Sequence, residues 1–510
     1  MRLSNKHANV QAVDYMDFTG GLNTAKAIET IEFNELGRCI NLELNGSQLQ
    51  TVSGTAELVS DDDIHFTDCT YDTINNLVVL CGIEYDEHDE MTGRYVYTVK
   101  PDGTELTKRG TLNGSITPGF AVWESGVLIA SGGKLQYWNG TTLETLTNSP
   151  SVCNGVFTSH GRVVVYYGDT VKYSAVGDET NWTEDDNDDS SSKFLQVGYK
   201  DGGTIISVVN LAQDILVFKN NNTAYHIAGQ FPEWQVREIS RNVEDKGYRS
   251  TVALTNSALV LGRTALNAIT PTDDYGEMRA TNLAQKVEPN IKNLQSNIKL
   301  RFVAPLNQVW FMSGYRRFLF FDVAHQTFFE REYNVEAVDV CYKGDTVYVL
   351  KEHELCYLDN GLDMTDGGDL LHWVMDAKTL VSQNDYLVKR VRVDITPLFQ
   401  TYADVRFYVG HIQVTDLVPK EAHQIWHDYT KIYHNRRQIK SQPITQVYIN
   451  GDEIYDNDFE IYKNDTYIKS MVYVRRDKRQ IDRHKAIRVH GKGSGGRFTL
   501  DRINCEIVEV

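Results

Sequence analysis

The residues with the clearest capacity for metal chemistry are two histidines in the C-terminal part of the chain. His423 and His427 stand four positions apart, with Asp428 and His434 close by. On a helix the two rings would share one face, as zinc ligands can. The spacing is not H-E-x-x-H, however, and neighbouring aromatic residues make an ordinary packed segment an equally good explanation. We expect no metal site here.

Two further segments have only some features of ligand-binding loops. The glycine-rich run GKGSGG at residues 491–496 is followed by a strand-like segment and not by a helix, so we expect a hairpin turn in place of a phosphate site. A run of carboxylates lacks the glycine and the distant Glu of an EF-hand loop, so we expect a solvated acidic loop. Its members are Asp178, Glu179, Glu184, Asp185, Asp186, Asp188 and Asp189.

No catalytic motif stands out. The sequence has no G-x-S-x-G elbow, no paired-carboxylate motif and no S-x-D-x-G-x-x-W box of sialidase-type propellers. Glycosidase carboxylates can lie anywhere in a sequence, so a polysaccharide hydrolase is the enzymatic alternative. We expect a protein without enzymatic activity or cofactors.

Composition favours a chain of many short strands. Its 510 residues include 28 Tyr, and 37 Gly exceed 10 Pro, which suits strands joined by tight turns. The first twenty residues lack a signal-peptide core, and no apolar run approaches the ~18 residues of a membrane span. Seven dispersed Cys predict neither a disulfide framework nor a zinc site, which is typical of a protein that matures in the cytoplasm.

Charge is distributed unevenly along the chain. The net charge of −18 argues against general affinity for nucleic acid. Residues 431–502 contain 16 basic and 9 acidic residues (+7), and the remainder contains 35 and 60 (−25). We expect the densest basic cluster to dock on an acidic partner or a neighbouring subunit; DNA contact and a solvated strand face are the alternatives. Its members are Arg475, Arg476, Lys478, Arg479, Arg483, Lys485 and Arg488.

One pattern recurs seven times: an apolar strand, a short turn rich in Gly, Asn or Asp, and a second strand with alternating Tyr and aliphatic residues. The copies begin near Asn75, Ser125, His160, Ala212, Asn256, Leu306 and Lys343. Their separations are 50, 35, 52, 44, 50 and 37 residues, close to the roughly 40–50 residues of a four-stranded propeller blade. One or two β-sandwiches are the alternative, but sandwiches rarely show so many similar hairpins.

The sequence therefore predicts an all-β protein. We expect a β-propeller of six or seven blades over residues 61–360 and an additional C-terminal β domain over residues 361–510. The polar, glycine-rich segment after Asp359 separates the two. Residues 1–60 are expected to be extended and to contribute to the propeller or to contacts in an oligomeric ring.

Three segments resemble the nozzle proteins of short-tailed bacteriophages, a family also described as packaged-DNA stabilisation or tail-accessory proteins. The first spans residues 16–54, the second residues 160–182, and the third residues 214–234 with the Gly-containing segment after it. The first segment departs from its relatives at Ser53, where they usually have Arg. It matches them at Gly20, Gly21, Leu22, Asn23, Asn41, Gly46 and Leu49. The three segments cover roughly the first half of the chain.

The resemblance implies a structural virion protein of the phage tail, usually six copies of which form a closed ring and line the channel for DNA retention and ejection. The implied partners are copies of the chain itself, adaptor proteins beneath the portal, and tail fibres or a tail needle, with DNA as non-specific cargo. An acidic lumen would repel phosphates, and we expect the acidic loop to face it.

The alternative reading is a receptor- or glycan-binding tail propeller, either an adhesin or a depolymerase. A glycan binder should expose clustered aromatic residues on loops. In this chain Trp123, Trp138 and Trp310 lie inside strand patterns instead.

Overall fold

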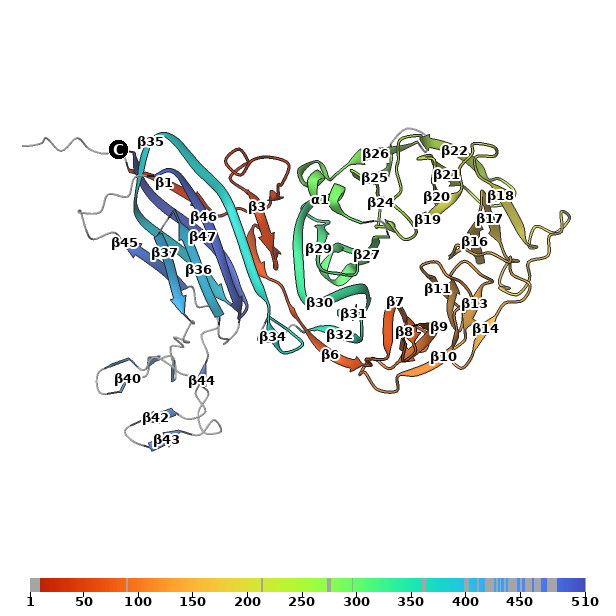
Figure 1. Ribbon diagram of the computed structural model, residues 1–510, viewed down its shortest axis with the longest axis horizontal. Coiled ribbons are helices and arrows are strands. Elements are labelled where there is room, and N and C mark those ends of the chain that lie inside the picture. Colours follow the sequence, from red (N-terminus) through yellow and green to blue (C-terminus); the bar gives the residue numbers. More distant parts are fainter. Residues whose placement is uncertain are drawn as a thin grey trace, which may run out of the picture. The chain divides into compact units, whose positions relative to one another are not determined.

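The computed structural model describes residues 10–88, 90–211, 214–272, 277–295, 297–359, 364–398, 403–410, 412–417 and 484–509, together with short strands between residues 426 and 474. The chain forms two compact units (Figure 1). The first, here called the propeller unit, contains Ala56–Phe328 and Tyr333–Leu358. The second, here called the terminal unit, contains Met1–Thr55, Phe329–Glu332 and Asp359–Val510.

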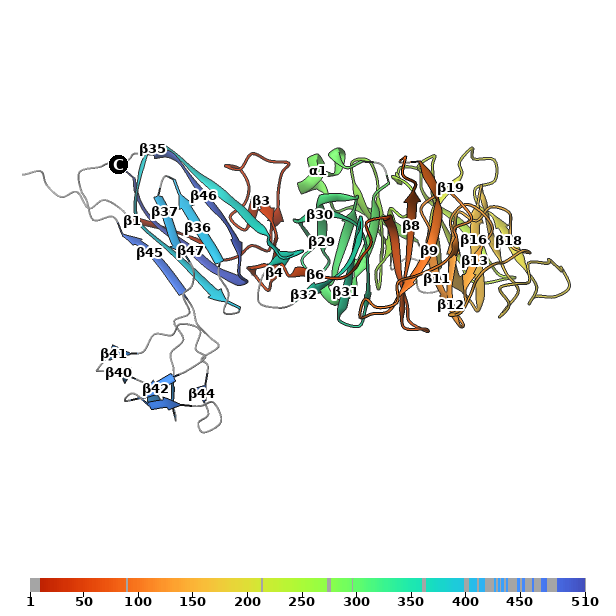
Figure 2. The same cartoon turned by 60° about the horizontal axis from the view of Figure 1, so that its bottom comes forward.

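The propeller unit begins with blades whose four antiparallel strands pair in the order of the sequence (Figures 1 and 2). The first blade contains β7 (Ile64–Asp72), β8 (Leu77–Tyr85), β9 (Met91–Val99) and β10 (Thr107–Thr111). The second contains β11 (Gly119–Trp123), β12 (Gly126–Ala130), β13 (Gln136–Trp138) and β14 (Leu143–Thr145). The third contains β15 (Gly155–Ser159), β16 (Arg162–Tyr167), β17 (Thr170–Tyr173) and β18 (Lys193–Gln196).

The next two blades repeat this arrangement. The fourth contains β19 (Ile205–Leu211), β20 (Asp214–Lys219), β21 (Ala224–Ala228) and β22 (Gln235–Ser240). The fifth contains β23 (Thr251–Ala253), β24 (Ala258–Leu261), β25 (Leu266–Pro271) and β26 (Met278–Asn282). The short helix α1 (Glu288–Asn293) follows it. The first strands pack on one another, β11 on β15, β15 on β19, β19 on β23 and β23 on β27, so they surround the propeller axis.

Two more four-stranded sheets complete the propeller by sharing the long strand β30 (Thr327–Lys343). The sixth blade contains β27 (Lys299–Val303), β28 (Gln308–Met312), β29 (Tyr315–Asp322) and β30. In the seventh, the end of β30 pairs with β31 (Thr346–Lys351), then β32 (Glu354–Asp359), then β6 (Gly54–Ser60) from the N-terminal part of the chain. Five separate sheets and these two give seven blades, so the chain is an all-β propeller protein.

The hairpins predicted from the sequence supply the middle strands of the blades. The copy near Asn75 is β8, and the six later copies are the second and third strands of their blades. These middle strands are buried along most of their length, as in β12, β16 and β24. The outermost strands β14, β22 and β26 are largely exposed. The hydrophobic pattern is therefore strongest in the strands that have neighbours on both sides.

The terminal unit contains two sheets that share the long strand β35 (His372–Pro397). One sheet joins β3 (Glu35–Ile40), the start of β35, β46 (His484–Gly495), β36 (Ala403–Val409) and β37 (Ile412–Leu417). The other joins β1 (Val10–Tyr15), β47 (Phe498–Glu509), the end of β35 and β45 (Lys469–Val474). Trp373 packs against Phe407 of the first sheet and Phe498 of the second, with ring centroids 5.6 and 5.1 Å away.

Short strands complete the terminal unit. They are β2 (Gly21–Leu22), β4 (Leu42–Asn45), β5 (Gln48–Thr51), β33 (Thr365–Asp366), β34 (Asp369–Leu370), β38 (Trp426–His427), β39 (Thr430–Lys431), β40 (Tyr433–His434), β41 (Arg437–Gln438), β42 (Val447–Ile449), β43 (Asp452–Ile454) and β44 (Ile461–Tyr462). Of the helices in the described part of the chain, none has the length and apolar character that a membrane crossing requires.

Two features differ from the sequence-based expectation. Strands β1–β5 fold with the C-terminal region, and only β6 joins the propeller, because β1 pairs with β47 and β3 pairs with β35. The glycine run at 491–496 is also not a simple turn: residues 491–495 continue β46, and the chain turns only after Gly495. A Cβ at Gly491 would lie 2.8–2.9 Å from Phe407, Met375 and Trp373, so close packing requires glycine there.

Candidate functional site

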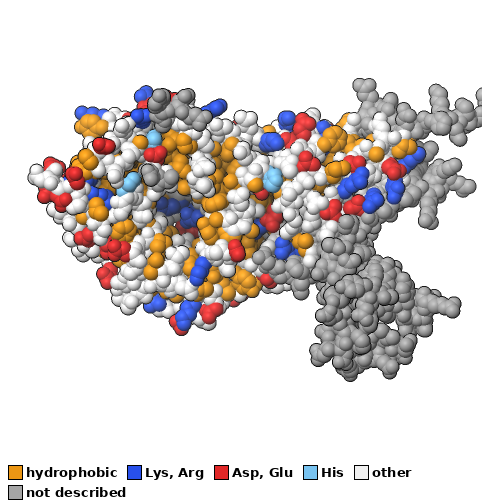
Figure 3. All heavy atoms as spheres, turned by 180° about the vertical axis from the view of Figure 1, so that it is seen from behind, with side chains coloured by type: hydrophobic (Ala, Val, Ile, Leu, Met, Phe, Trp, Pro, Cys, Tyr) orange, Lys and Arg blue, Asp and Glu red, His pale blue; other side chains and the backbone are white. Residues whose placement is uncertain are grey.

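A cavity of about 360 Å³ lies among the first strands of the propeller blades. Its walls combine apolar side chains with two arginines, Arg249 and Arg301. The other lining residues are Cys69, Thr70, Tyr71, Pro118, Gly119, Phe120, Val156, Val208, Phe302, Val340, Cys341 and Tyr342. Figure 3 shows one face of the propeller unit. A hollow in that face contains basic side chains, and apolar side chains surround it. We call this cavity the channel site, because it lies among the strands that surround the propeller axis. Propellers commonly bind ligands near this axis.

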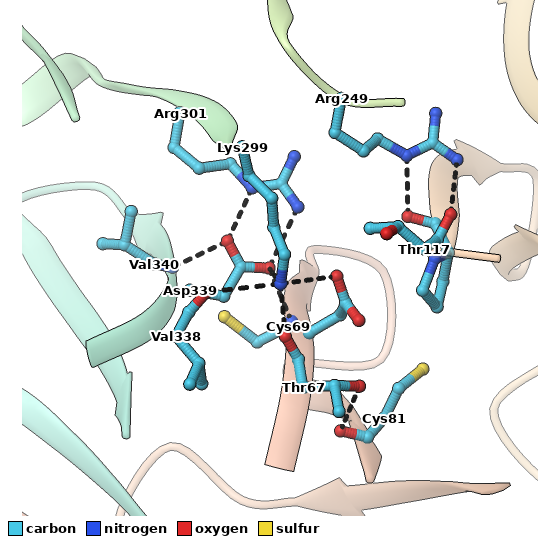
Figure 4. Close-up of polar contacts among 12 residues, drawn as sticks. Thr67, Cys69, Cys81, Thr117, Arg249, Lys299, Arg301, Val338, Asp339 and Val340 are labelled. Atoms are coloured by element: carbon cyan, nitrogen blue, oxygen red, sulfur yellow. Dashed lines mark hydrogen bonds and ion pairs between the residues drawn. The ribbon is translucent and has the colours of Figure 1, made fainter. Parts of the chain in front are cut away.

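Two ion pairs form the polar centre of the channel site (Figure 4). The Arg301 guanidinium donates from Nε to Asp339 Oδ1 at 2.7 Å and from Nη2 to Asp339 Oδ2 at 2.9 Å. Lys299 Nζ lies 2.8 Å from Asp68 Oδ1 and also donates to the carbonyl oxygens of Thr67 and Val338. The two basic residues alternate with Leu300 along β27, so their side chains extend to the same side of the strand.

Asp339 is the centre of this network. Its side chain is fully buried, and it accepts additional hydrogen bonds from the backbone amides of Cys69 and Val340. Burial alone would raise the pKa of Asp339, but attraction to Arg301 and then Lys299, together with the hydrogen bonds, holds that pKa below its ordinary value. The Asp339 carboxylate is therefore charged at neutral pH, and it stabilises the two cations of β27, Lys299 and Arg301.

The buried Cys69 thiol of the channel site is not activated. Burial, then the hydrogen bond with Cys341, raises the pKa of Cys69 well above its ordinary value. A thiol must ionise to act as a nucleophile or metal ligand, so Cys69 is chemically inert at neutral pH. All seven cysteines are buried, and no disulfide bond joins any two of them.

Arg249 crosses the channel toward the second blade. It has a φ of +73°, an unfavourable value for a non-glycine residue, and its Nε donates to the carbonyl oxygen of Pro118 at 2.8 Å. A Cβ at Gly119 would lie 1.9 Å from Arg249 Nη2, so the missing side chain of this glycine makes room for the guanidinium. Arg249 thus connects the loop before the fifth blade to the second blade across the axis.

A carboxyl group near Arg249 has the opposite electrostatic behaviour. Asp245 accepts hydrogen bonds from the hydroxyls of Ser207 and Ser250 and from the amide of Gly247. Burial outweighs these bonds and raises the pKa of Asp245 to about 6. The folded protein therefore binds a proton at this position more tightly than the unfolded chain does.

This shift predicts a pH-dependent stability difference between the wild type and an Asp245→Asn variant. The pKa is about 6 when folded and 3.8 in the unfolded reference, so protonation favours folding and the benefit is lost as pH rises through that window. A shift of about 2 units corresponds to roughly 3 kcal/mol. Urea denaturation between pH 4 and 7 should show that the free energy of unfolding of the wild type falls, relative to that of the variant, as the pH rises. Asp345→Asn, in an exposed turn, is the matched control, and a constant difference for Asp245→Asn would refute the shift.

The predicted acidic loop connects β17 to β18, the outermost strand of the third blade. Several of its carboxylates have partners in the same blade or the preceding one: Glu179 accepts a hydrogen bond from Trp123 Nε1, and Glu184 pairs with Lys172 at 2.8 Å. Hydrogen bonds from Thr180 and Ser190 lower the pKa of Asp178 and Asp188, respectively. The remaining members, Asp185, Asp186 and Asp189, are exposed.

Buried Arg162 holds the acidic loop against its blade. The guanidinium donates to the carbonyl oxygens of Ser174 at 2.7 Å and of Ser191 and Asp189 at 2.5 Å. Arg162 thus ties the loop to β16, and the acceptors of these three hydrogen bonds are all backbone carbonyl oxygens. That the loop faces a DNA channel remains a prediction.

The predicted basic cluster is described only at its end. Arg475, Arg476, Lys478, Arg479 and Arg483 lie outside the described residues, as do His423 and Asp428 of the histidine segment, while His427 and His434 lie in β38 and β40. Lys485 is exposed, and Arg488 is 60 % exposed although it pairs with Asp376 at 2.8 Å. Arg488 therefore already has an acidic partner within its own unit.

The channel site was not predicted from the sequence. Asp68, Lys299 and Asp339 are far apart in the chain, and each is unremarkable by itself. The available signal was the placement of charged residues within otherwise apolar strands, such as Asp339 in the segment AVDVCY. Because buried charges are rarely left unpaired, such residues predict a partner but do not identify it.

No protein-family model and no curated protein sequence matches the chain. Solved structures similar to it include U3-55K and YCF48 from Cyanidioschyzon merolae, each 10 % identical in sequence. Each match covers 60 % of this chain and 98 % of the other, with TM-scores of 0.40 and 0.39. These values carry no argument about function, and the propeller fold rests on the sheet topology described above.

Proposed function

We propose that the chain is a structural subunit of the tail nozzle of a short-tailed bacteriophage. In this proposal, copies of the chain form a closed ring, usually of six, beneath the adaptor proteins of the portal. The ring lines the channel through which DNA leaves the virion, and it assembles in the host cytoplasm. The observation that carries the proposal is that residues in the segments resembling nozzle proteins stabilise the internal structure of each unit.

Asn41 shows this structural role most clearly in the first segment. It has a left-handed φ of +56°, and its side chain is buried. Nδ2 donates to the carbonyl oxygens of Glu332 and His372, at 2.9 and 2.7 Å, and Oδ1 accepts from the amide of Glu332 at 2.8 Å. One side chain thus joins three separate parts of the terminal unit.

The other two segments have comparable roles in the propeller. His160 and Gly161, with φ of +50° and +68°, form the turn between β15 and β16, and Arg162 follows them. In the third segment, Lys219 is fully buried and lies 2.6 Å from Asp201 Oδ1. These residues stabilise the propeller itself, which supports a structural role for the segments that resemble nozzle proteins.

The tryptophans and the channel charges support a structural role over glycan binding. Trp138, Trp310 and Trp373 are fully buried, so they are not available to stack on a sugar ring. Lys299 and Arg301 are both paired with carboxylates of neighbouring strands. A rigid wall needs such internally satisfied charges, whereas an open binding site leaves polar groups for its ligand.

The proposal predicts where the chain lies in a virion. Phage particles that contain it should bind a gold-labelled antibody, raised against the purified chain, on the short tail. An averaged cryo-electron microscopy map should then show six copies in a closed ring, since rotational symmetry ends the growth of head-to-tail interfaces. A single copy, or a three-fold fibre at the tail periphery, would contradict the proposal.

The enzymatic alternative has its own test. Purified chain incubated with capsular or cell-wall polysaccharide should release no reducing ends. Release that a single Asp or Glu substitution abolishes would favour the depolymerase instead. Saturable glycan binding without cleavage would favour the adhesin.

A further inference from the structure

We propose that His65, Glu352 and His353 form a zinc-binding site that joins the first blade of the propeller to the seventh. His65 belongs to β7, the first strand of the first blade, and the other two residues lie in the turn between β31 and β32. This site is separate from the predicted histidine segment and does not depend on the proposed tail function. We call it the closure site, because it lies where the ring of blades closes.

The three side chains already converge. The His65 and His353 rings lie 4.3 Å apart between centroids, and His65 Nδ1 is 3.1 Å from Glu352 Oε1. One ligand atom from each residue lies within 4.8 Å of the other two. Ligand atoms on a tetrahedral zinc ion are roughly 3.3 Å apart, given bonds of about 2.0–2.1 Å. Small side-chain rotations would therefore complete the coordination.

Backbone contacts fix the two sides of the closure site against each other. The amide of Phe66 donates to the carbonyl oxygen of Glu352 at 2.7 Å, and the amide of Asp61 donates to that of His353 at 2.9 Å. His353 Nδ1 lies 3.0 Å from the carbonyl oxygen of Ile64. A hydrogen bond of this kind orients the ring and leaves Nε2 for a metal, as the outer-shell partners of metal-binding histidines do.

The surroundings of the closure site favour a cation. Ile64, whose carbonyl faces His353, and Tyr85, whose ring centroid is 4.9 Å from that of His65, both line an adjoining pocket of about 700 Å³. The charged residues of that pocket are Asp61, Asp63, Glu84, Asp86, Glu87 and Lys108. An excess of carboxylates around a pocket raises the local concentration of cations.

The donor set selects the class of ion. Two imidazoles and one carboxylate suit Zn²⁺ and similar transition metals, whereas Ca²⁺ and Mg²⁺ prefer oxygen ligands throughout. The side chains of His65 and Glu352 are 39 % and 40 % exposed, so water has access to the remaining coordination position. A bound ion would cross-link two blades that are far apart in sequence and would thus stabilise circular closure.

The test is zinc binding by the full-length chain. The chain carries no histidine tag, and treatment with EDTA first removes any bound metal. Equilibrium dialysis against ZnCl₂ should give one bound ion per chain, and Co²⁺ should give the visible absorption of a coordinated ion. His65→Ala and His353→Ala should each weaken binding by at least about 10- to 100-fold, since even outer-shell changes have effects of that size. Zinc should raise the melting temperature of the wild type and not of these variants.

Two control variants separate the closure site from other histidines. His325 pairs with Asp322 at 3.0 Å in the sixth blade, so His325→Ala removes a similar His–carboxylate pair and should leave zinc binding unchanged. His427→Ala, in the C-terminal histidine segment, should also leave zinc binding unchanged. Failure of the wild type to bind zinc in a saturable way, or binding that persists in His65→Ala and His353→Ala, would overturn the proposal.

Discussion

Replacing Asp339 by asparagine should lower the free energy of unfolding of the propeller unit by about 3–5 kcal/mol, the usual cost of removing one partner from a buried ion pair. Asn is close to Asp in size, so the change removes the charge with little change in volume. Arg301 would lose both charge-assisted hydrogen bonds, and Lys299 would keep only Asp68 as an acidic partner. Urea denaturation followed by circular dichroism measures the loss.

Two comparisons show whether the effect comes from the uncompensated charge. Glu238→Gln breaks an exposed pair with Arg241, whose side chain is 77 % exposed, and should cost less than about 1 kcal/mol. An Arg301→Met change in the Asp339→Asn background should restore part of the lost stability, since it removes the unpaired cation. A loss below about 1 kcal/mol for Asp339→Asn, or no recovery in the double variant, would show that the channel pair contributes little.

The propeller itself was predictable because its strongest signal is local. The middle strands of each blade have neighbours on both sides, so segments such as RVVVYY in β16 and ALVL in β24 are almost wholly buried and apolar. A tight turn rich in Gly, Asn or Asp then separates each such strand from the next. The first and last strands have a weaker pattern because one of their sides faces the channel or solvent, as in β22.

Closure of the propeller was not predictable in the same way. Strand β6 completes the seventh blade beside β32, about 300 residues later in the chain, and β30 is shared between two blades. Pairing of this kind depends on long-range geometry, which leaves no periodic mark in the sequence. For this reason the sequence left six and seven blades open, and it did not predict that β1 and β3 pair with strands of the C-terminal region.

The charged sites show the same limit. The sequence drew attention to residues that are dense along the chain, such as the carboxylates between Asp178 and Asp189, which lie in a loop at the outer strand of one blade. The channel site and the closure site each combine residues more than 200 positions apart, and their side chains converge only in the folded propeller. A single histidine at position 65 gives no sign of its partner at 353.

The second large effect is expected in the terminal unit, where Asn41→Ala should cost about 3–5 kcal/mol. The change removes three side-chain hydrogen bonds and leaves the amide and carbonyl of Glu332 and the carbonyl of His372 without these partners. Alanine must also adopt a φ of +56°, which asparagine tolerates better and which costs roughly 1 kcal/mol or more. Urea denaturation, with hydrogen exchange of residues 35–52 as a local measure, gives the size and the place of the loss.

Two variants divide this loss into its causes. Asn41→Gly keeps the left-handed backbone and removes only the hydrogen bonds, so it should be less destabilising than Asn41→Ala by about the backbone term. Asn307 has a similar φ of +52° at an exposed position, so Asn307→Ala measures the backbone term by itself, at about 1 kcal/mol. If Asn41→Ala cost no more than Asn307→Ala, the three hydrogen bonds would contribute nothing measurable. The role of Asn41 would then be its backbone conformation alone, and its side chain would not stabilise the contacts between the segments that contain Asn41, Glu332 and His372.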